Sequence, residues 1–234
     1  MTEAEIWYFI LHEIHNTYGT AAIMGNLMAE SSLNPRCATG LGKTGILDTG
    51  EYILKSDNGQ HDFVNDLVAF GLVQWRYWSR KQGLLDYAKS KGVSVGDART
   101  QLEFMLKELR NYKTAWTAVI NAVEIRTASD AFMLKYERPA GTGEAAKKKR
   151  AELAQKFFDR YMDGNLSEKP VRMVRATSNV NLRAGDSTAY AKAGSIRKGT
   201  ECEWVATSTT GWHAIRYKTG IYWVSNEFTE VIAE

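Results

Sequence analysis

The sequence predicts a two-domain protein, with a mainly α-helical N-terminal domain and a small all-β barrel after it. Apolar residues recur at helical spacing through most of the first part of the chain. Beyond it they alternate with polar residues between short turns. The 234 residues suffice for one or two domains of about 100–200 residues each. We expect a helical domain over residues 1–163, a linker over 164–170 and a β domain over 171–234.

The first two helices are expected near the N-terminus. Residues 3–18 carry apolar side chains at helical spacing, and Gly19 is expected to end that helix. Thr20 is a suitable N-cap for residues 21–30. This second segment is almost wholly apolar, so it should be a buried helix, and Pro35 prevents its continuation.

Residues 38–73 are rich in glycine and polar residues, which predicts an irregular region with at most a small hairpin. Helical patterns then return, and Asp97 and Ser129 are plausible N-caps. The expected helices cover residues 79–91, 99–112, 114–123, 128–136 and 144–162. On the last one, the basic run at residues 147–150 is expected to be a solvated face, with contact to a partner surface or substrate as the alternative.

The β domain is predicted from short alternating segments. Strands are expected near residues 180–183, 202–206, 212–217 and 221–224, separated by glycine-containing turns. About 60 residues are enough for one small barrel. We expect most aromatic residues here to belong to its core.

Composition excludes several classes of protein. The net charge of +3 does not indicate a nucleic-acid partner, and no apolar run is long enough to span a membrane. The two cysteines, Cys37 and Cys202, are expected to be reduced thiols, and no cofactor or metal site is expected. The histidine pair His12 and His15 lacks the spacing of a zinc helix. A cysteine peptidase using Cys37 and His61 has no supporting motif around either residue.

The strongest candidate for a catalytic residue is Glu30, at the end of the apolar helix. Apolar neighbours and the negative end of the helix dipole both favour the protonated form of a carboxyl group. A carboxylic acid that keeps its proton can protonate the leaving oxygen of a glycoside. From these residues alone, a surface glutamate at a frayed helix end remains the favoured alternative.

A resemblance reverses that preference. The segment from Ala22 to Pro35, AIMGNLMAESSLNP, resembles the catalytic helix of phage tail-type lysozymes, relatives of goose-type lysozymes and lytic transglycosylases. The segment FGLVQW at residues 70–75, with the helix after it, is similar to the Gly-x-x-Gln-Trp block of that family. Phe70 stands where a tyrosine is expected. The segment YERPA at residues 136–140 also fits the family's late helix and loop.

The resemblance implies roles for individual residues. Glu30 would be the general acid, while Gln74, Trp75 and Tyr77 would bind the glycan. Trp75 could alternatively be a core residue, and Trp78 is expected in the core. A second catalytic carboxylate would come from Asp48, Asp57, Asp62 or Asp66, with Asp66 fitting best. Asp66 could instead structure the loop or bind sugar, because many relatives use a single glutamate.

The β domain has a resemblance of its own. The segment SNVNLRAG at residues 178–185, with later glycine and tryptophan positions, resembles bacterial SH3-type (SH3b) domains that bind cell walls. Such domains generally bind the peptide part of peptidoglycan. Tyr190 and Trp212 are the candidate contacts.

These resemblances predict a muramidase that cuts the β-1,4 bond between N-acetylmuramic acid and N-acetylglucosamine in bacterial peptidoglycan. A lytic transglycosylase and a non-catalytic wall-binding or tail structural protein are the alternatives. The first residues, MTEAE, lack the basic start of a secretory signal. The enzyme is therefore expected to reach the wall through a holin or on a phage tail.

Overall fold

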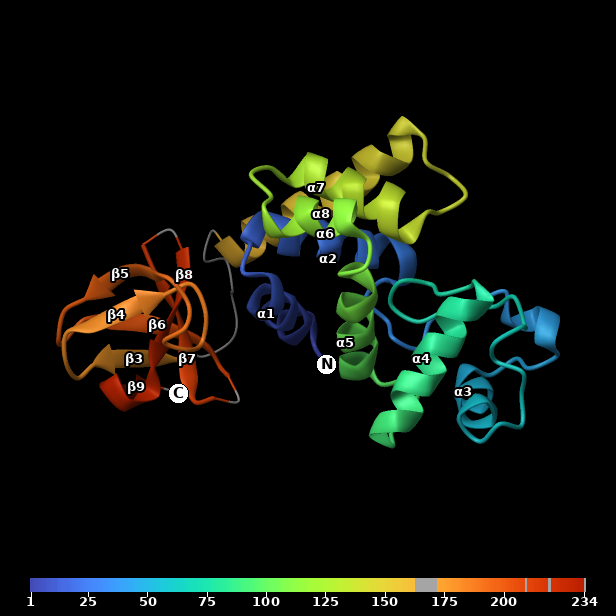
Figure 1. The fold of residues 1–234 in the computed structure, drawn as a ribbon, viewed down its shortest axis with the longest axis horizontal. Helices are drawn as coiled ribbons and strands as arrows, with labels where there is room; N and C mark the ends of the chain where they lie inside the picture. Colours follow the sequence, from blue (N-terminus) through green and yellow to red (C-terminus); the bar gives the residue numbers. More distant parts are fainter. Residues whose placement is uncertain (163–171, 209, 219, 234) are drawn as a thin grey trace. The chain divides into compact units, whose positions relative to one another are not determined.

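The computed structural model describes residues 1–162, 172–208, 210–218 and 220–233 (Figure 1). The linker predicted at residues 164–170 lies outside the described residues. The chain forms two compact units: Met1–Ile10 with Asn16–Phe157, and Leu11–His15 with Phe158–Glu234. The predicted fold class is confirmed, because the N-terminal region is helical and the C-terminal region is an all-β sheet.

Eight α-helices and short additional turns make up the described helical region. The helices are α1 (Glu3–Ile14), α2 (Thr17–Ser31), α3 (Thr49–Asp57), α4 (Trp78–Lys91), α5 (Ala98–Leu109), α6 (Lys113–Ile120), α7 (Ile125–Phe132) and α8 (Glu144–Met162). A 3-10 turn, η1 (Leu41–Thr44), follows β1 (Ala38–Thr39), and a π-helical turn, η2 (Met133–Glu137), follows α7. Strand β1 pairs antiparallel with β2 (Ala69–Phe70).

Helix α2 is the centre of the helical unit, and α6, α7 and α8 run close to it (Figure 1). Two glycines permit this packing. A Cβ atom at Gly19 would lie 1.9 Å from the Val119 carbonyl oxygen on α6. A Cβ atom at Gly25 would lie 2.5 Å from the Arg150 carbonyl oxygen and 2.5 Å from the Ala154 nitrogen on α8. Helix α8 therefore approaches α2 one and a half turns before Glu30.

The prediction that Gly19 ends the first helix is wrong. Asn16 starts α2 instead, because its side-chain oxygen accepts a hydrogen bond of 2.8 Å from the Gly19 N–H. The Asn16 amide also donates to the Ile120 and Ala122 carbonyls at 3.2 and 3.0 Å. The absence of a side chain at Gly19 thus serves helix packing and not helix termination.

The region expected to be irregular contains a helix, α3. Asp48 caps it by accepting a hydrogen bond of 2.8 Å from the Glu51 N–H. Tyr52 and Ile53 are buried, so tertiary packing stabilises a segment whose glycine content predicts a loop.

The cap predicted at Asp97 is confirmed, because its side chain accepts from the Thr100 N–H at 2.8 Å. The cap predicted at Ser129 is wrong. Glu124 caps α7 by accepting from the Thr127 N–H at 3.0 Å, and Ser129 is buried. The Ser129 hydroxyl instead accepts a hydrogen bond of 3.0 Å from the Asn26 amide on α2.

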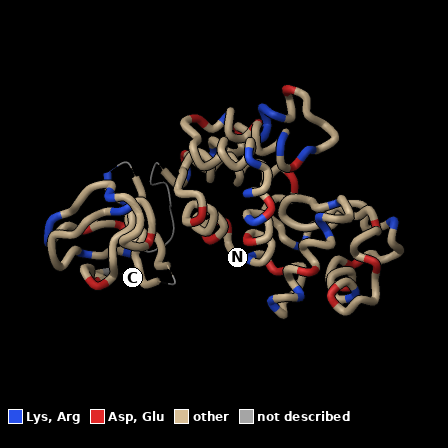
Figure 2. The backbone as a smooth tube through the Cα atoms, viewed as in Figure 1, with Lys and Arg blue, Asp and Glu red and all other residues tan. Residues whose placement is uncertain are grey.

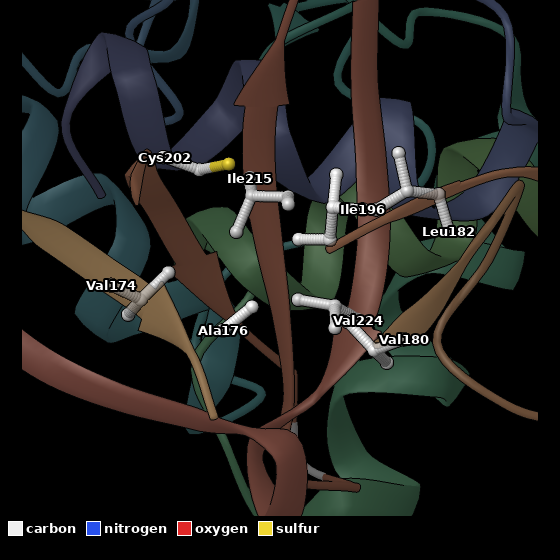
Figure 3. Close-up of a cluster of buried hydrophobic side chains, with 8 residues drawn as sticks. All are labelled: Val174, Ala176, Val180, Leu182, Ile196, Cys202, Ile215 and Val224. Carbon is white, nitrogen blue, oxygen red and sulfur yellow. The ribbon is translucent and has the colours of Figure 1, made fainter. Parts of the chain in front are cut away.

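Over the described residues, the C-terminal sheet has seven strands in the order β5-β4-β8-β7-β6-β3-β9, each paired antiparallel with its neighbours. The strands are β3 (Met173–Ala176), β4 (Val180–Arg183), β5 (Lys192–Ile196), β6 (Glu201–Thr207), β7 (Trp212–Tyr217), β8 (Gly220–Ser225) and β9 (Thr229–Ala233). Figure 3 shows the side chains of its core, which are Val174, Ala176, Val180, Leu182, Ile196, Cys202, Ile215 and Val224. The predicted alternation is thus present, with Cys202 facing inward as a free thiol.

Lys and Arg are interspersed with Asp and Glu along the described backbone (Figure 2). Among the described residues, no helix combines the length and the apolar character that a bilayer crossing requires.

The contact at Gly25 gives a stability prediction. Gly25→Ala should lower the free energy of unfolding by about 1–3 kcal/mol, because the new methyl group overpacks the α2–α8 contact. Chemical denaturation measures this change. Gly42→Ala is the control, since a Cβ atom there meets nothing within 4 Å, and its effect should stay within about 0.5 kcal/mol. A stabilised Gly25→Ala protein would contradict the close packing of these helices.

Candidate active site

Glu30 lies in the last turn of α2, where the chain leaves the helix. Ser32 adopts the left-handed conformation, φ 54°, and its N–H donates to the Met28 carbonyl. The side chain of Glu30 retains 18% of its exposure, so it can reach a bound molecule. A carboxylate here faces the negative end of the helix dipole, and α2 has no basic residue in its last turn. A cation from another helix compensates for this.

That cation is Arg150 on α8. Its Nη2 atom donates to Glu30 Oε1, and its Nε atom lies 3.6 Å from Glu137 Oε2. One guanidinium therefore lies between two carboxyl groups. The basic run at residues 147–150 is solvated at Lys148 and Lys149, as expected, but Arg150 is only 8% exposed. The expectation of a solvated face is wrong for Arg150.

Glu137 is the most buried member of this cluster, which we call the Glu30–Arg150–Glu137 cluster. Its side chain is 2% exposed, and neither of its oxygens has a hydrogen-bond partner among the described residues. Burial, assisted by the negative charge of Glu30, raises the pKa of Glu137 to about 8, although Arg150 and Arg80 oppose this. Glu137 therefore keeps its proton at neutral pH.

A π-helical turn positions Glu137. The turn η2 ends at Glu137, and Arg138 follows in the left-handed conformation with φ 54°. Such turns are rare and occur frequently at functional sites. The residue before it, Tyr136, is buried and donates a hydrogen bond of 2.9 Å to Glu108. Adjacent residues of the turn thus point to different partners, Tyr136 to Glu108 and Glu137 to Arg150.

Glu108 on α5 collects a second set of donors. Arg80 donates from Nε and Nη2 at 3.0 and 2.9 Å, and the Trp75 indole N–H donates at 2.7 Å. Trp75 is 0% exposed. Its ring has no free face for a sugar, so the predicted glycan-binding role is corrected to the alternative, a core tryptophan.

Gln74 shapes a turn next to the end of α2. It adopts φ 53°, and its amide donates to the Gly71 and Cys37 carbonyls at 2.9 and 3.2 Å. Ser31, the neighbour of Glu30, donates 2.9 Å to the Leu72 carbonyl. The Gly-x-x-Gln-Trp block therefore lies against the C-terminal end of α2, and backbone carbonyls already accept both hydrogen bonds of the Gln74 amide.

Two exposed aromatic residues follow this block. Tyr77 is 63% and Trp78 is 55% exposed, with ring centroids 6.0 Å apart. The expectation that Trp78 belongs to the core is wrong. Because large aromatic faces open to solvent suit pyranose rings, Tyr77 keeps its predicted glycan-binding role as a candidate and Trp78 joins it.

Asp66 is committed to a separate buried network. Its side chain is 3% exposed and lies 2.5 Å from the fully buried Lys81 amine. It also accepts from the Tyr52 hydroxyl at 2.7 Å and pairs with His61 Nε2 at 2.9 Å. Burial lowers the pKa of Lys81 against the opposing charge of Asp66, and burial raises the pKa of Tyr52. These contacts match the loop-structuring alternative for Asp66.

The other acidic candidates of this region serve local structure. Asp48 caps α3, Asp57 accepts from the Val95 N–H at 2.9 Å, and Asp62 accepts from the Asn65 N–H at 3.1 Å. Within the described ranges, no three His, Cys, Asp or Glu side chains gather as a metal site.

In the β unit, Tyr190 and Trp212 are both partly exposed. The Tyr190 ring covers Gly185, where a Cβ atom would lie 2.5 Å from ring atoms, and its carbonyl accepts from Arg183 at 2.7 Å. Trp212 starts β7 opposite Ser225.

Two residues of the cluster were not predicted from the sequence as site residues. Glu137 lies within the quoted YERPA segment, and Arg150 closes the basic run. A signal for Arg150 existed in principle, because an otherwise apolar helix that ends in an acid needs a cation nearby. The sequence does not show that α8 supplies it.

The fold and the site together define a helical protein in which a partly exposed glutamate is backed by a buried arginine–glutamate pair. The family model described as phage tail lysozyme matches residues 1–161, and the chain belongs to this family. The resemblance predicted for the N-terminal domain is thereby confirmed. Membership supports a peptidoglycan-lytic phage enzyme that acts on the cell wall. A comparison with curated proteins finds no match.

The buried network around Lys81 gives a second prediction. Lys81→Met should lower the free energy of unfolding by about 3–5 kcal/mol, because it leaves the Asp66 carboxylate buried without its cation. Urea denaturation measures the loss. Lys55→Met removes an ion pair with Glu51 whose side chains are 40% and 49% exposed, so it should cost at most about 1 kcal/mol. Equal, small losses in both variants would show that Asp66 is not held as described.

Proposed function

We propose that this protein is a muramidase that cleaves the β-1,4 bond between N-acetylmuramic acid and N-acetylglucosamine. The observation that carries the proposal is the partly exposed Glu30 at the end of α2, backed by Arg150, in a chain of the phage tail lysozyme family. Glu30 is the proposed general acid. A sugar alkoxide is a poor leaving group, so bond cleavage needs a proton on the glycosidic oxygen.

In the proposed mechanism, the glycan lies across the end of α2 and Glu30 protonates the glycosidic oxygen. The sugar develops oxocarbenium character, and water attacks its anomeric carbon. Exposed rings of Tyr77 and Trp78 are proposed to stack on pyranose units. We do not propose Asp66 as the second catalytic carboxylate, because Lys81, Tyr52 and His61 already occupy it.

A lytic transglycosylase is the second candidate. It is supported by the contacts of Asp66 with Lys81, Tyr52 and His61, which leave this carboxylate unsuited to act as a nucleophile. That reaction shares the acid step at Glu30, after which the muramyl 6-hydroxyl attacks and forms a 1,6-anhydro product. It needs no second carboxylate as nucleophile.

We further propose that the β unit is an SH3b domain that binds the peptide part of the wall, within the proposed boundaries of residues 171–234. Tyr190 and Trp212 are the proposed contacts because both are partly exposed aromatic residues, a type that anchors interfaces. Release through a holin or carriage on a phage tail would bring the enzyme to the wall.

The catalytic proposal predicts the outcome of one substitution. Glu30→Gln keeps the shape of the side chain and removes the acid, so clearing of purified Gram-positive walls should fall by about two orders of magnitude or more. Turbidity measures clearing, and mass spectrometry of the released fragments separates reducing muramyl ends from anhydro ends.

Glu152→Gln is the matched control, because Glu152 lies on α8 with 61% of its side chain exposed. It should clear walls like the unchanged protein. Equal clearing by Glu30→Gln would refute the site, and binding without clearing by every protein would favour a non-catalytic wall-binding or tail protein.

The wall-binding proposal predicts weaker attachment when its contacts are removed. Trp212→Ala and Tyr190→Ala, each made in the full-length Glu30→Gln protein so that walls stay intact, should weaken co-sedimentation with walls by about tenfold. Phe228→Ala, at another exposed aromatic residue of the β unit, should not. Unchanged binding by the first two variants, with unchanged thermal stability, would exclude these contacts.

A further inference from the structure

The Glu30–Arg150–Glu137 cluster holds more charged groups than acid catalysis by Glu30 requires. Two carboxyl groups face one guanidinium, and that guanidinium belongs to a side chain with only 10% exposure. If Glu30 takes up a proton to act as an acid, the Arg150 charge loses its partner. An unpaired buried cation is strongly unfavourable. Something else must then balance Arg150.

We propose that Glu137 is a positioning residue that shares one proton and one guanidinium with Glu30, so that Glu30 can be protonated while Arg150 stays neutralised. The inference rests on the proposed role of Glu30. Glu137 is placed for this task, because its Oε2 atom already lies 3.6 Å from Arg150 Nε and its oxygens have no other hydrogen-bond partner among the described residues.

In the proposed resting arrangement, Arg150 pairs with the Glu30 carboxylate and Glu137 carries the proton. A glycan that covers Glu30 removes water from its carboxylate, which disfavours the charged form. Glu137 then releases one proton and Glu30 takes one up, directly or through water. Arg150 changes its partner from Glu30 to Glu137. The numbers of protons and charges in the cluster are the same before and after, so no co-reactant is needed.

The groups around Glu137 fit this exchange. It faces Glu30 from α2, Arg150 from α8 and Arg80 from α4. Arg80 is already paired in two hydrogen bonds with Glu108, which leaves Arg150 as the cation shared with Glu30. Burial raises the pKa of Glu137 to about 8. The cluster therefore keeps this proton through neutral pH and releases it when the pH rises above about 8.

The pH profile of hydrolysis of soluble, uncrosslinked peptidoglycan strands tests the proposal in the full-length protein. Activity of the unchanged protein should fall as the pH rises through about 8. Glu137→Gln cannot ionise to balance Arg150, so kcat at neutral pH should fall by about tenfold or more. Its alkaline limb should move to lower pH by about one pH unit or more, with KM little changed. Glu137→Asp should restore part of kcat and of the alkaline limb.

Carboxyl 13C NMR of protein labelled at glutamate gives a readout that does not depend on activity. One resonance should titrate near pH 8 and be missing from the Glu137→Gln spectrum. Thermal unfolding identifies variants that lose the fold. A Glu137→Gln protein that folds and keeps the unchanged pH profile would overturn the inference, as would a Glu137 resonance that titrates at the ordinary value for glutamate.

The same assay separates this inference from the proposed function. If Glu30→Gln retains full activity, the assignment of the acid is wrong. If Glu30→Gln is inactive and Glu137→Gln shows the unchanged profile, only the role of Glu137 is wrong.

Discussion

The rest of the site depends on two contacts of Arg150, one with Glu30 and one with Glu137. A carboxylate in the last turn of an apolar helix is disfavoured by the helix dipole, and a fully buried carboxylate is disfavoured by loss of water. A single guanidinium faces both groups: it pairs with Glu30, while burial keeps the proton on Glu137. The guanidinium can face both only because α8 lies against α2, and the missing side chain at Gly25 allows that approach. The chemistry of the site and the packing of the helices therefore both require the close approach of α8 to α2 at Gly25.

Hydrogen bonds to α5 and to the Gly-x-x-Gln-Trp block fix the positions of Glu137 and of the end of α2. Glu108 fixes Tyr136, Arg80 and Trp75, which places the π-helical turn and hence Glu137. The hydrogen bond from Ser31 to the Leu72 carbonyl ties the end of α2 to the Gly-x-x-Gln-Trp block. The residues of that block with the strongest resemblance to the family thus act mainly by placing the backbone around Glu30. The exposed aromatic rings near this block are those of Tyr77 and Trp78, which follow it after Arg76.

Periodicity predicted the fold class well, because the spacing of apolar residues along one helix or strand is a local property of the sequence. It failed where distant packing decided the outcome: Gly19 fits against Val119, and α3 forms within a glycine-rich region. At the site, Glu30 stood out through its position after an apolar helix, whereas Asp66 was favoured without knowledge of Lys81. Glu137 and Arg150 could not be paired from the sequence, because their contact depends on how α8 meets the turn after α7. A buried arginine within a basic run looks like its solvated neighbours.

We propose that the glycan binds at Glu30, with Arg150 and Glu137 behind it. A crystal structure of the Glu30→Gln protein with a peptidoglycan fragment that spans the scissile bond tests this most directly. We expect the glycosidic oxygen within hydrogen-bond distance of the side chain at position 30, with Arg150 displaced toward Glu137. A fragment bound away from the end of α2, with position 30 still turned to Arg150 alone, would contradict it.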